Sequence, residues 1–354
     1  MRGILLLWLL PFLSGAQTPV DTAVRFSFES SLYASRIITG EANLQAFTSL
    51  HPLTIQAGLS WVRNGRSQWN YCNCLIRNGS SLTWTDFKDG RLGHAFSVSA
   101  YTEPVLWHRP RWQVSLQGGT GLAYMTRVYN ANSNPENTFY SAPLSFLLTL
   151  GPSVQWQLNP HWFLSLHGRL QHISNGGRRD PNDGMNLLLA GLQLRYTPSL
   201  SVYHLWEHKK RPPNQWITTV HAFGFYRQLT PSSPSVPVGG FNATFARTLG
   251  RISALGLGGE LYYDGLSKYR KQQSGEAIAD WVPSMHIAHQ LTLGKLLFSQ
   301  QLAWYLTLQT GFSERTFQRY VLAYSFKPGW YGGITLKAHV DRSDYFALLV
   351  ARRW

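Results

Sequence analysis

Residues 112–124 read WQVSLQGGTGLAY, and this stretch decides the fold class. Its even positions are mostly large and apolar, whereas its odd positions are small or polar: Trp112, Val114, Leu116, Gly118, Thr120, Leu122 and Tyr124 alternate with Gln113, Ser115, Gln117, Gly119, Gly121 and Ala123. Successive side chains of a β-strand project from opposite faces of the sheet. The stretch therefore predicts a strand with one apolar face and one face of small or polar residues.

The same alternation recurs along the chain in segments of about ten to fourteen residues. We expect strands near residues 22–33, 53–63, 92–102, 112–128, 144–157, 161–174, 186–197, 216–228, 238–249, 253–263, 284–307 (two strands), 316–326, 330–340 and 344–354. Bacterial single-chain barrels have even strand numbers, and some marginal segments are expected to be excursions, so the pattern predicts an all-β antiparallel barrel of roughly 12–14 strands. A soluble β-sandwich alternates in the same way, so composition must decide between the two.

The composition favours a transmembrane barrel. Hydrophobic residues make up 44% of the 354 residues and aromatic residues 14%, but charged residues only 14%, against about 25% in soluble domains. The apolar and aromatic content excludes intrinsic disorder, and the 2 cysteines exclude a disulfide-stapled scaffold. After residue 16 no apolar run approaches the ~18–20 residues that a membrane-spanning helix needs, which excludes a helical membrane protein.

The N-terminus predicts export. Met1–Arg2 is a short positive segment, Ile4–Leu13 is apolar, and Ser14-Gly15-Ala16 supplies the small residues of a cleavage site. These features are typical of a secretory signal peptide over residues 1–16. No break in composition marks a second domain, so we expect residues 17–354 to form a single barrel. Trp354 ends an amphipathic segment, which fits a barrel whose last strand pairs with its first.

Two polar residues end the apolar row of the segment 161–174. His172 and Ser174 follow Leu166 and Leu170 on the same face, and Asn186 begins the matching row of the next segment. Hairpin pairing predicts that these three polar residues meet at one rim of the barrel, on its outer wall. One interpretation is an ordinary polar rim at the height of the lipid headgroups. The other is a serine-hydrolase pair in which His172 is the general base for Ser174.

The turn that follows is rich in glycine. Gly176 and Gly177 come directly after the serine, and their backbone N–H groups are candidates for an oxyanion hole. The substrate of a site on the outer wall would be a membrane lipid, because that wall faces the bilayer.

The residues around this turn resemble a known family. His172-Ile173-Ser174-Asn175-Gly176-Gly177 and Pro181-Asn182-Asp183-Gly184-Met185-Asn186 are similar to the core motif of the lipid A 3-O-deacylases, whose relatives are often called acyloxyacyl hydrolases. The core resemblance covers residues 90–200, and the remaining half is similar to extended members of the family. Leu336–His339 and Asp344 resemble the C-terminal pattern of those members.

The resemblance implies an enzyme of the Gram-negative outer membrane that hydrolyses the 3-O acyl ester of lipid A. It implies Ser174 as nucleophile, His172 as base, and Asn175 with Gly177 as the oxyanion hole. The acid of the family falls here on Asn186. An asparagine orients the imidazole by a hydrogen bond but does not stabilise an imidazolium by charge, so either turnover is slower or Asp180 or Asp183 supplies the acid.

The net charge of +15 is favourable for binding an anionic substrate. Arg178 and Arg179 lie in the loop beside the predicted site, where they are candidates for binding lipopolysaccharide phosphates; a generic basic rim is the alternative. Nucleic acid is not expected as a partner of an exported barrel. We expect no metal or cofactor, and we expect Cys72 and Cys74 to be a loop feature, since they lie too close together in sequence for an easy disulfide.

The alternative function is a catalytically weak or inactive barrel with a structural or porin-like role. A porin has a long inward-folded loop and a charged lumen. The inward rows here are small and weakly polar, which favours a narrow, filled barrel.

Overall fold

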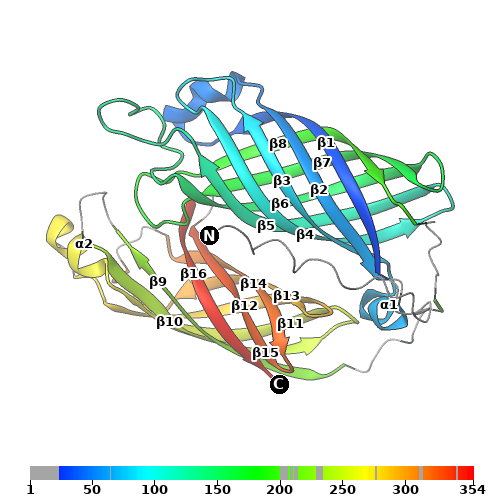
Figure 1. Ribbon diagram of the computed structural model, residues 1–354. Helices are drawn as coiled ribbons and strands as arrows, with labels where there is room; N and C mark the ends of the chain where they lie inside the picture. Colours follow the sequence, from blue (N-terminus) through cyan, green and yellow to red (C-terminus); the bar gives the residue numbers. More distant parts are fainter. Residues whose placement is uncertain are drawn as a thin grey trace, which may run out of the picture.

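A computed structural model describes residues 24–63, 65–199, 206–207, 210, 214–228, 234–275, 277–310, 314–339 and 342–354, so the predicted signal peptide lies outside the described residues. Two closed antiparallel barrels of eight strands each make up the fold (Figure 1). The first contains β1 (Val24–Ile38), β2 (Leu53–Arg63), β3 (Ile76–Asp86), β4 (His94–His108), β5 (Trp112–Met125), β6 (Leu144–Gln157), β7 (Trp162–Ser174) and β8 (Met185–Tyr196). The second contains β9 (Trp216–Arg227), β10 (Val236–Thr248), β11 (Ser253–Asp264), β12 (Trp281–Leu293), β13 (Leu296–Tyr305), β14 (Thr316–Lys327), β15 (Trp330–His339) and β16 (Arg342–Arg353).

The all-β antiparallel barrel is confirmed, but the single barrel of 12–14 strands is corrected. β1 pairs with β8, so that Phe28 lies opposite Tyr196, and β16 pairs with β9 and not with the first strand. Alternation assigns each residue to a face, but it does not encode which distant strands pair, and closure depends on that pairing. β3 was missed because Asn78 and Ser80 interrupt its outward apolar row.

The barrel walls are apolar outside and polar inside. Leu82 and Leu257 are each 67% exposed on the outer walls, whereas the lumens hold buried ion pairs such as Arg77–Glu103 and, in the second barrel, Arg319–Glu260. Inward side chains reach across the lumen, as Arg169 of β7 does to Gln56 of β2 and Gln117 of β5. The inward rows carry more charge than expected. No described helix is long and apolar enough to span a membrane.

Each barrel has one rim of longer loops. In the first barrel these loops are residues 39–52, 87–93, 126–143 and 175–184, and they follow β1, β3, β5 and β7. The 3₁₀ helix η2 (Ala42–Ser49) lies in the first of them. In the second barrel, residues 228–235, 265–280 and 306–315 form the longer connections, including α2 (Ser267–Ser274). The opposite rim of the first barrel has the short turns 109–111 and 158–161, and α1 (Arg66–Cys72) lies in a longer connection there, between β2 and β3. Outer-membrane barrels have short turns on the periplasmic side and longer loops outside, so the rim with most of the long loops is the external one.

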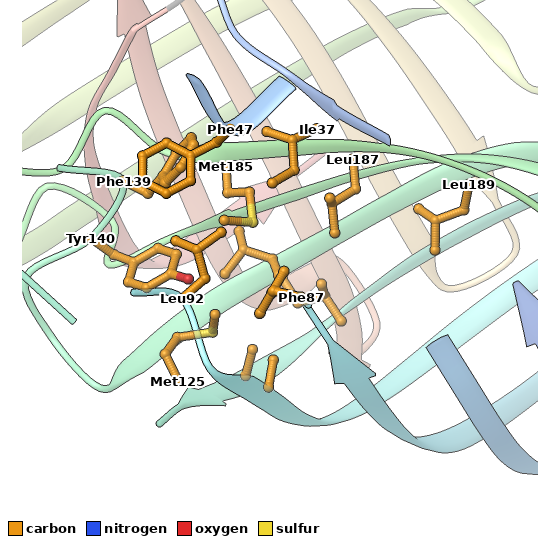
Figure 2. Close-up of a cluster of buried hydrophobic side chains, with 14 of the residues drawn as sticks. Ile37, Phe47, Phe87, Leu92, Met125, Phe139, Tyr140, Met185, Leu187 and Leu189 are labelled. Atoms are coloured by element: carbon orange, nitrogen blue, oxygen red, sulfur yellow. The ribbon is translucent and has the colours of Figure 1, made fainter. Parts of the chain in front are cut away.

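A cluster of buried apolar side chains closes the long-loop rim of the first barrel from inside (Figure 2). Phe47 and Phe139 come from two of the loops, whereas Ile173 lies near the end of β7 and Met185 begins β8. Phe47 and Phe139 pack with ring centroids 5.4 Å apart. Because Ile173 and Met185 adjoin His172, Ser174 and Asn186 in sequence, this cluster fixes the strand ends from which those polar residues project.

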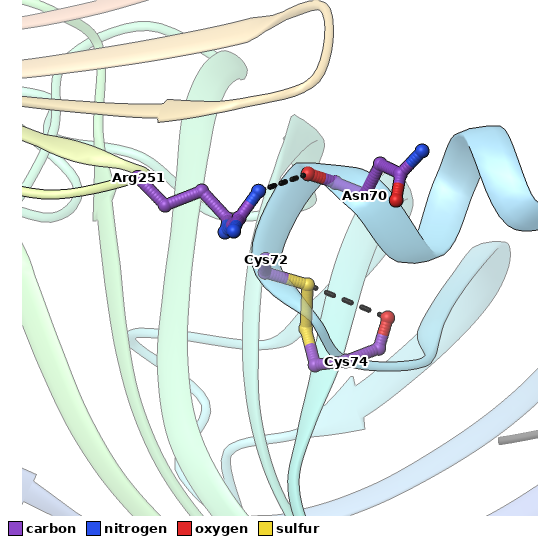
Figure 3. The surroundings of a disulfide bond; sticks show 4 residues. All are labelled: Asn70, Cys72, Cys74 and Arg251. Carbon is purple, nitrogen blue, oxygen red and sulfur yellow. Dashed lines mark hydrogen bonds between the residues drawn. A yellow bond between two sulfur atoms is a disulfide. The ribbon is translucent and has the colours of Figure 1, made fainter. Parts of the chain in front are cut away.

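The two barrels lie side by side and meet at both ends (Figure 1). At the long-loop rim, the Phe346 N–H donates to the Gly176 carbonyl over 2.8 Å. At the opposite end, Arg251 donates to the Asn70 carbonyl of α1 (Arg66–Cys72) over 3.2 Å (Figure 3). Both long-loop rims therefore lie on the same side, as two barrels in one membrane require.

Cys72 and Cys74 form a disulfide beside this second contact (Figure 3). The sequence-based expectation was wrong, because Asn73 adopts a left-handed conformation with φ 55° that brings the two Cα atoms to 5.1 Å. Disulfides persist in oxidising compartments, which agrees with an exported chain.

Candidate functional site

His172 and Asn186 lie opposite each other in the β7–β8 pair, as the hairpin prediction required. The imidazole Nδ1 donates a hydrogen bond to Asn186 Oδ1 over 2.7 Å. Both side chains project from the outer face of the barrel, since the flanking residues Gln171, Ile173, Met185 and Leu187 are buried. With the proton held on Nδ1, the lone pair of the imidazole lies on Nε2.

The Nε2 atom of His172 is buried and has no hydrogen-bond partner among the described residues. Gly184, with φ +76°, lies against the same edge of the ring, and a Cβ there would be 2.7 Å from His172 Cε1. A buried basic nitrogen without a partner is costly for a purely structural histidine, whereas a general base needs such a nitrogen.

Ser174 ends β7 on the same outer face but is fully buried. Its Oγ accepts a hydrogen bond from the Gly176 N–H over 3.4 Å. Phe146 lies opposite Ser174 in the β6–β7 pair, and its ring packs on Phe346 of the second barrel with centroids 4.7 Å apart. The serine therefore lies on the side of the first barrel that faces the second barrel, and not on an open wall.

The turn after Ser174, from which the sequence predicts an oxyanion hole, contains two successive glycines in the left-handed conformation. Gly176 and Gly177 both have positive φ, +71° and +66°. In a trans peptide the C=O and the following N–H point in opposite directions. The Gly176 carbonyl accepts from the Phe346 N–H, so the Gly177 N–H points away from the second barrel. Among the described residues, this N–H has no acceptor.

Asn175 has other partners than an oxyanion. Its backbone N–H donates to Asn182 Oδ1 over 2.8 Å, and its Nδ2 donates to the Arg179 carbonyl over 2.6 Å and to Ser141 Oγ over 3.2 Å. These contacts fold the turn back on itself, so Asn175 holds its shape. Asn182 also lies near the second barrel, since its Nδ2 donates to Ser343 Oγ over 3.4 Å.

The two arginines of the loop differ. The Arg178 side chain is exposed, whereas the Arg179 guanidinium donates to the Ser141 carbonyl and is tied to the loop. Asp183 accepts from Thr138 Oγ1 over 2.5 Å, and the imidazole of His172 is bound by Asn186 and not by Asp183 or Asp180.

Two buried histidines away from this site lie in the lumens. His167 Nε2 lies 3.3 Å from Ser153 Oγ inside the first barrel, and His339 Nε2 lies 2.8 Å from Tyr305 Oη inside the second. Lys337 is also buried, with Nζ 3.0 Å from Asp344 Oδ2. No described group of three or more His, Cys, Asp or Glu is placed to hold a metal ion.

Sequence reasoning missed three residues that lie at the site: Gly184 against the imidazole, and Arg227 and Phe346 against the turn. Gly184 carried one signal, since glycine in a turn often marks a positive φ. Nothing in the alternation placed Arg227 and Phe346 there, because their position depends on how the two barrels pack.

The comparisons with known proteins divide the chain at the junction between the barrels. Residues 53–195 match the family model for the lipid A 3-O-deacylase (PagL), and residues 188–351 match the model for the C-terminal domain of acyloxyacyl hydrolase. No curated protein matches the chain.

Three solved structures illustrate the structural similarity. The outer membrane enzyme PagL is 18% identical, with 48% of this chain and 98% of that chain covered at a TM-score of 0.33. Neisserial surface protein A is 9% identical, with 49% and 98% covered at a TM-score of 0.34. A mutant Rh. blastica porin is 9% identical, with 94% and 100% covered at a TM-score of 0.22.

Proposed function

Because the chain belongs to the family of lipid A 3-O-deacylases and acyloxyacyl hydrolases, we propose that it removes the 3-O acyl chain of lipid A with Ser174 as nucleophile and His172 as general base. The chain is an ester hydrolase of the Gram-negative outer membrane. Its substrate is the lipid A of lipopolysaccharide, and the position of Ser174 at the long-loop rim supports action on the outer leaflet. The observation that carries the residue assignment is the His172–Asn186 hydrogen bond, which leaves the buried Nε2 as a proton acceptor.

The reaction proceeds in two steps, transfer of the acyl group to Ser174 and hydrolysis of the acyl-serine. Ser174 Oγ attacks the acyl carbonyl carbon, and its proton passes to His172 Nε2. Residues two apart in a strand share a face, so Ser174 turns from the Gly176 N–H toward His172 for this step. The Gly176 and Gly177 N–H groups stabilise the oxyanion. The tetrahedral intermediate collapses as His172 protonates the departing sugar oxygen, which leaves an acyl-serine. Water, deprotonated by His172, then hydrolyses the acyl-serine and releases the fatty acid.

Asn186 acts as a positioning residue that keeps the imidazole proton on Nδ1. Asn186→Leu removes the acceptor, and we expect kcat to fall about 10²-fold, since loss of the correct tautomer costs up to about 10⁴-fold in a serine protease triad. Asn186→Asp has the same reach and adds a charge that stabilises the imidazolium, so we expect kcat to rise about tenfold. The measurement is the rate of fatty acid release from purified lipopolysaccharide. Equal rates for both variants and the wild type would contradict the role of Asn186.

Arg178 is the candidate for phosphate binding, because its side chain is exposed beside the site, whereas Arg179 is tied to Ser141. We expect Arg178→Ala to raise KM for lipopolysaccharide about two- to fivefold and to leave kcat unchanged, since an exposed charge pair contributes at most about 1 kcal/mol. Dephosphorylated lipid A is the matched control substrate, and with it the wild type and the variant should have equal KM values. A KM effect of the same size on both substrates would exclude a phosphate contact.

A further inference from the structure

The strand pair β9–β16, which closes the second barrel, is not paired along its whole length. β9 pairs with β10 as far as Arg227, but it pairs with β16 only as far as Gly224, which lies opposite Leu348. The last residues of β9 and residues 342–347 at the start of β16 are therefore not paired with each other. This open seam lies at the long-loop rim, next to the turn of the first barrel.

Carbonyl groups of the turn of the first barrel accept hydrogen bonds from both sides of the open seam. On the β16 side, the Phe346 N–H donates to the Gly176 carbonyl over 2.8 Å. On the β9 side, the Gln228 N–H donates to the Arg178 carbonyl over 2.9 Å. Unpaired strand edges are costly when buried, and the turn satisfies part of both edges at this point.

Arg227 supplies the third contact, to the carbonyl between these two. Its Nε donates to the Gly177 carbonyl over 3.0 Å, and its Nη1 donates to Asp344 Oδ1 over 2.9 Å. The other carboxylate oxygen of Asp344 accepts from Lys337 Nζ over 3.0 Å. The guanidinium is buried and bound on two sides, so it holds the Gly177 carbonyl in a fixed direction.

Three successive carbonyls of the turn, those of Gly176, Gly177 and Arg178, are thus oriented by the second barrel. Their peptide planes carry the N–H groups of Gly177, Arg178 and Arg179 on the opposite side. The Arg178 N–H donates to Asn175 Oδ1 over 3.2 Å and so closes the turn. The Gly177 and Arg179 N–H groups have no acceptor among the described residues, and the Gly177 N–H, which is closer in sequence to Ser174, is the one we assign to the substrate. We propose that Arg227, through its guanidinium, and Phe346, through its backbone N–H, are positioning residues that hold the turn in the conformation of the oxyanion hole. Catalysis in the first barrel then requires the second barrel. This inference rests on the function proposed above.

The side chain of Phe346 also restrains the turn sterically. Its ring packs on Phe146, which lies opposite Ser174, and a Cβ on Gly176 would be 2.7 Å from the Phe346 ring. The ring therefore limits the movement of the turn toward the second barrel, while the hydrogen bonds limit its movement away from it.

The test uses the full-length protein, with one side-chain variant and one backbone variant of the seam. Arg227→Lys keeps the charge beside Asp344 but replaces two donor atoms by one. Its matched control is Arg319→Lys, the same change at another buried arginine of the second barrel, which donates to Glu260 and Thr335 in the lumen and does not touch the turn. Phe346→Pro removes the N–H, and Phe346→Ala is its control, because it removes the ring and keeps the N–H.

The readouts are kcat and KM for lipopolysaccharide and the rate at which a fluorophosphonate labels Ser174. Since a small misplacement of a catalytic group costs up to about 10²-fold, we expect kcat and the labelling rate to fall about 10- to 100-fold in Arg227→Lys and Phe346→Pro. KM should stay within about threefold, and Arg319→Lys should keep the wild-type kcat. Folding is followed by the migration of unheated protein in detergent gels, and if Phe346→Pro does not fold, Arg227→Lys decides alone.

Three results would overturn a proposal, and they can be told apart. If Arg227→Lys keeps kcat within about twofold of the wild type while Ser174→Ala is inactive, the positioning role is overturned and the proposed function stands. If Ser174→Ala deacylates lipid A as fast as the wild type, the proposed function fails, and the positioning role fails with it. A loss of kcat in Arg319→Lys equal to that in Arg227→Lys would also overturn the positioning role, because it would show a general effect of the second barrel's stability.

Discussion

Replacement of Ser174 by alanine is expected to abolish lipid A deacylation. The change removes only the nucleophilic oxygen, and the loss of one member of a catalytic triad lowers turnover by about 10⁴- to 10⁶-fold in serine proteases. Ser174 lies at a strand end, where its Oγ accepts only the 3.4 Å contact from Gly176 among the described residues, so the fold should survive. The measurement is mass spectrometry of lipid A from cells that express each variant, combined with the rate of fatty acid release in vitro.

Ser165→Ala is the matched control for this change. Ser165 lies on the same strand, β7, and is equally buried, but it faces the lumen of the first barrel. We expect Ser165→Ala to retain the wild-type acyl pattern. If the wild type and Ser174→Ala give identical lipid A under several growth conditions, the alternative of a catalytically inactive structural barrel replaces the enzyme.

The register of β7 and β8 was predictable from sequence, and so was the pairing that follows from it. Alternation placed His172 and Asn186 on the outer face, and hairpin geometry placed them opposite each other. Both inferences rest on the two-residue period of a strand, which holds for any sheet. The His172–Asn186 contact is therefore a local consequence of sequence, and the lumen positions of His167 and Lys337 follow in the same way.

The surroundings of Ser174 were not predictable in this way. Sequence placed Ser174 on a wall that faces lipid, whereas the structure buries it beside Phe146 and Phe346. That burial depends on two closures, β1 with β8 and β9 with β16, and on the packing of one barrel against the other. Such contacts join residues far apart in sequence, and no periodicity encodes them. The assignment of Asn175 to the oxyanion hole has the same difficulty, since its partners Ser141 and Asn182 come from different loops.

The two barrels together suit a substrate that never leaves the membrane. Outside the rims their walls carry exposed apolar residues such as Leu170 on β7 and Leu348 on β16. An acyl chain that reaches Ser174 laterally therefore stays in contact with apolar surface. The polar contacts are confined to the rim, where Arg178 and the turn meet the headgroup region. In the proposed function, recognition of the acyl chain is therefore separate from recognition of the phosphates.

Replacement of Gly177 by alanine is expected to lower kcat by at least about 10²-fold, because the residue has no room for a side chain and supplies an oxyanion donor. A Cβ on Gly177 would overlap the Asp344 carbonyl, which is backbone of β16 and cannot turn aside. The φ of +66° also disfavours any residue with a side chain. The turn must therefore leave the open seam of the second barrel, and the Gly177 N–H moves with it. The measurement is kcat for fatty acid release, with barrel folding followed in parallel.

Alanine variants of two other glycines, Gly168 and Gly176, serve as comparisons for Gly177→Ala. Gly168→Ala lies on the same strand as Ser174, and its Cβ would be 3.8 Å from the nearest atom, Pro152 Cγ, so we expect wild-type activity. Gly176→Ala meets the Phe346 and Phe146 rings at 2.7 and 2.9 Å, and rings move more easily than backbone, so its loss should be intermediate. Adding Phe346→Ala should restore part of that loss but none of the loss in Gly177→Ala, whose obstacle is the Asp344 carbonyl. Equal activity in all three glycine variants would mean that the seam does not position the oxyanion hole. If the second barrel fixes the turn, a Cβ that meets the Asp344 carbonyl must cost more activity than one that meets the two phenylalanine rings.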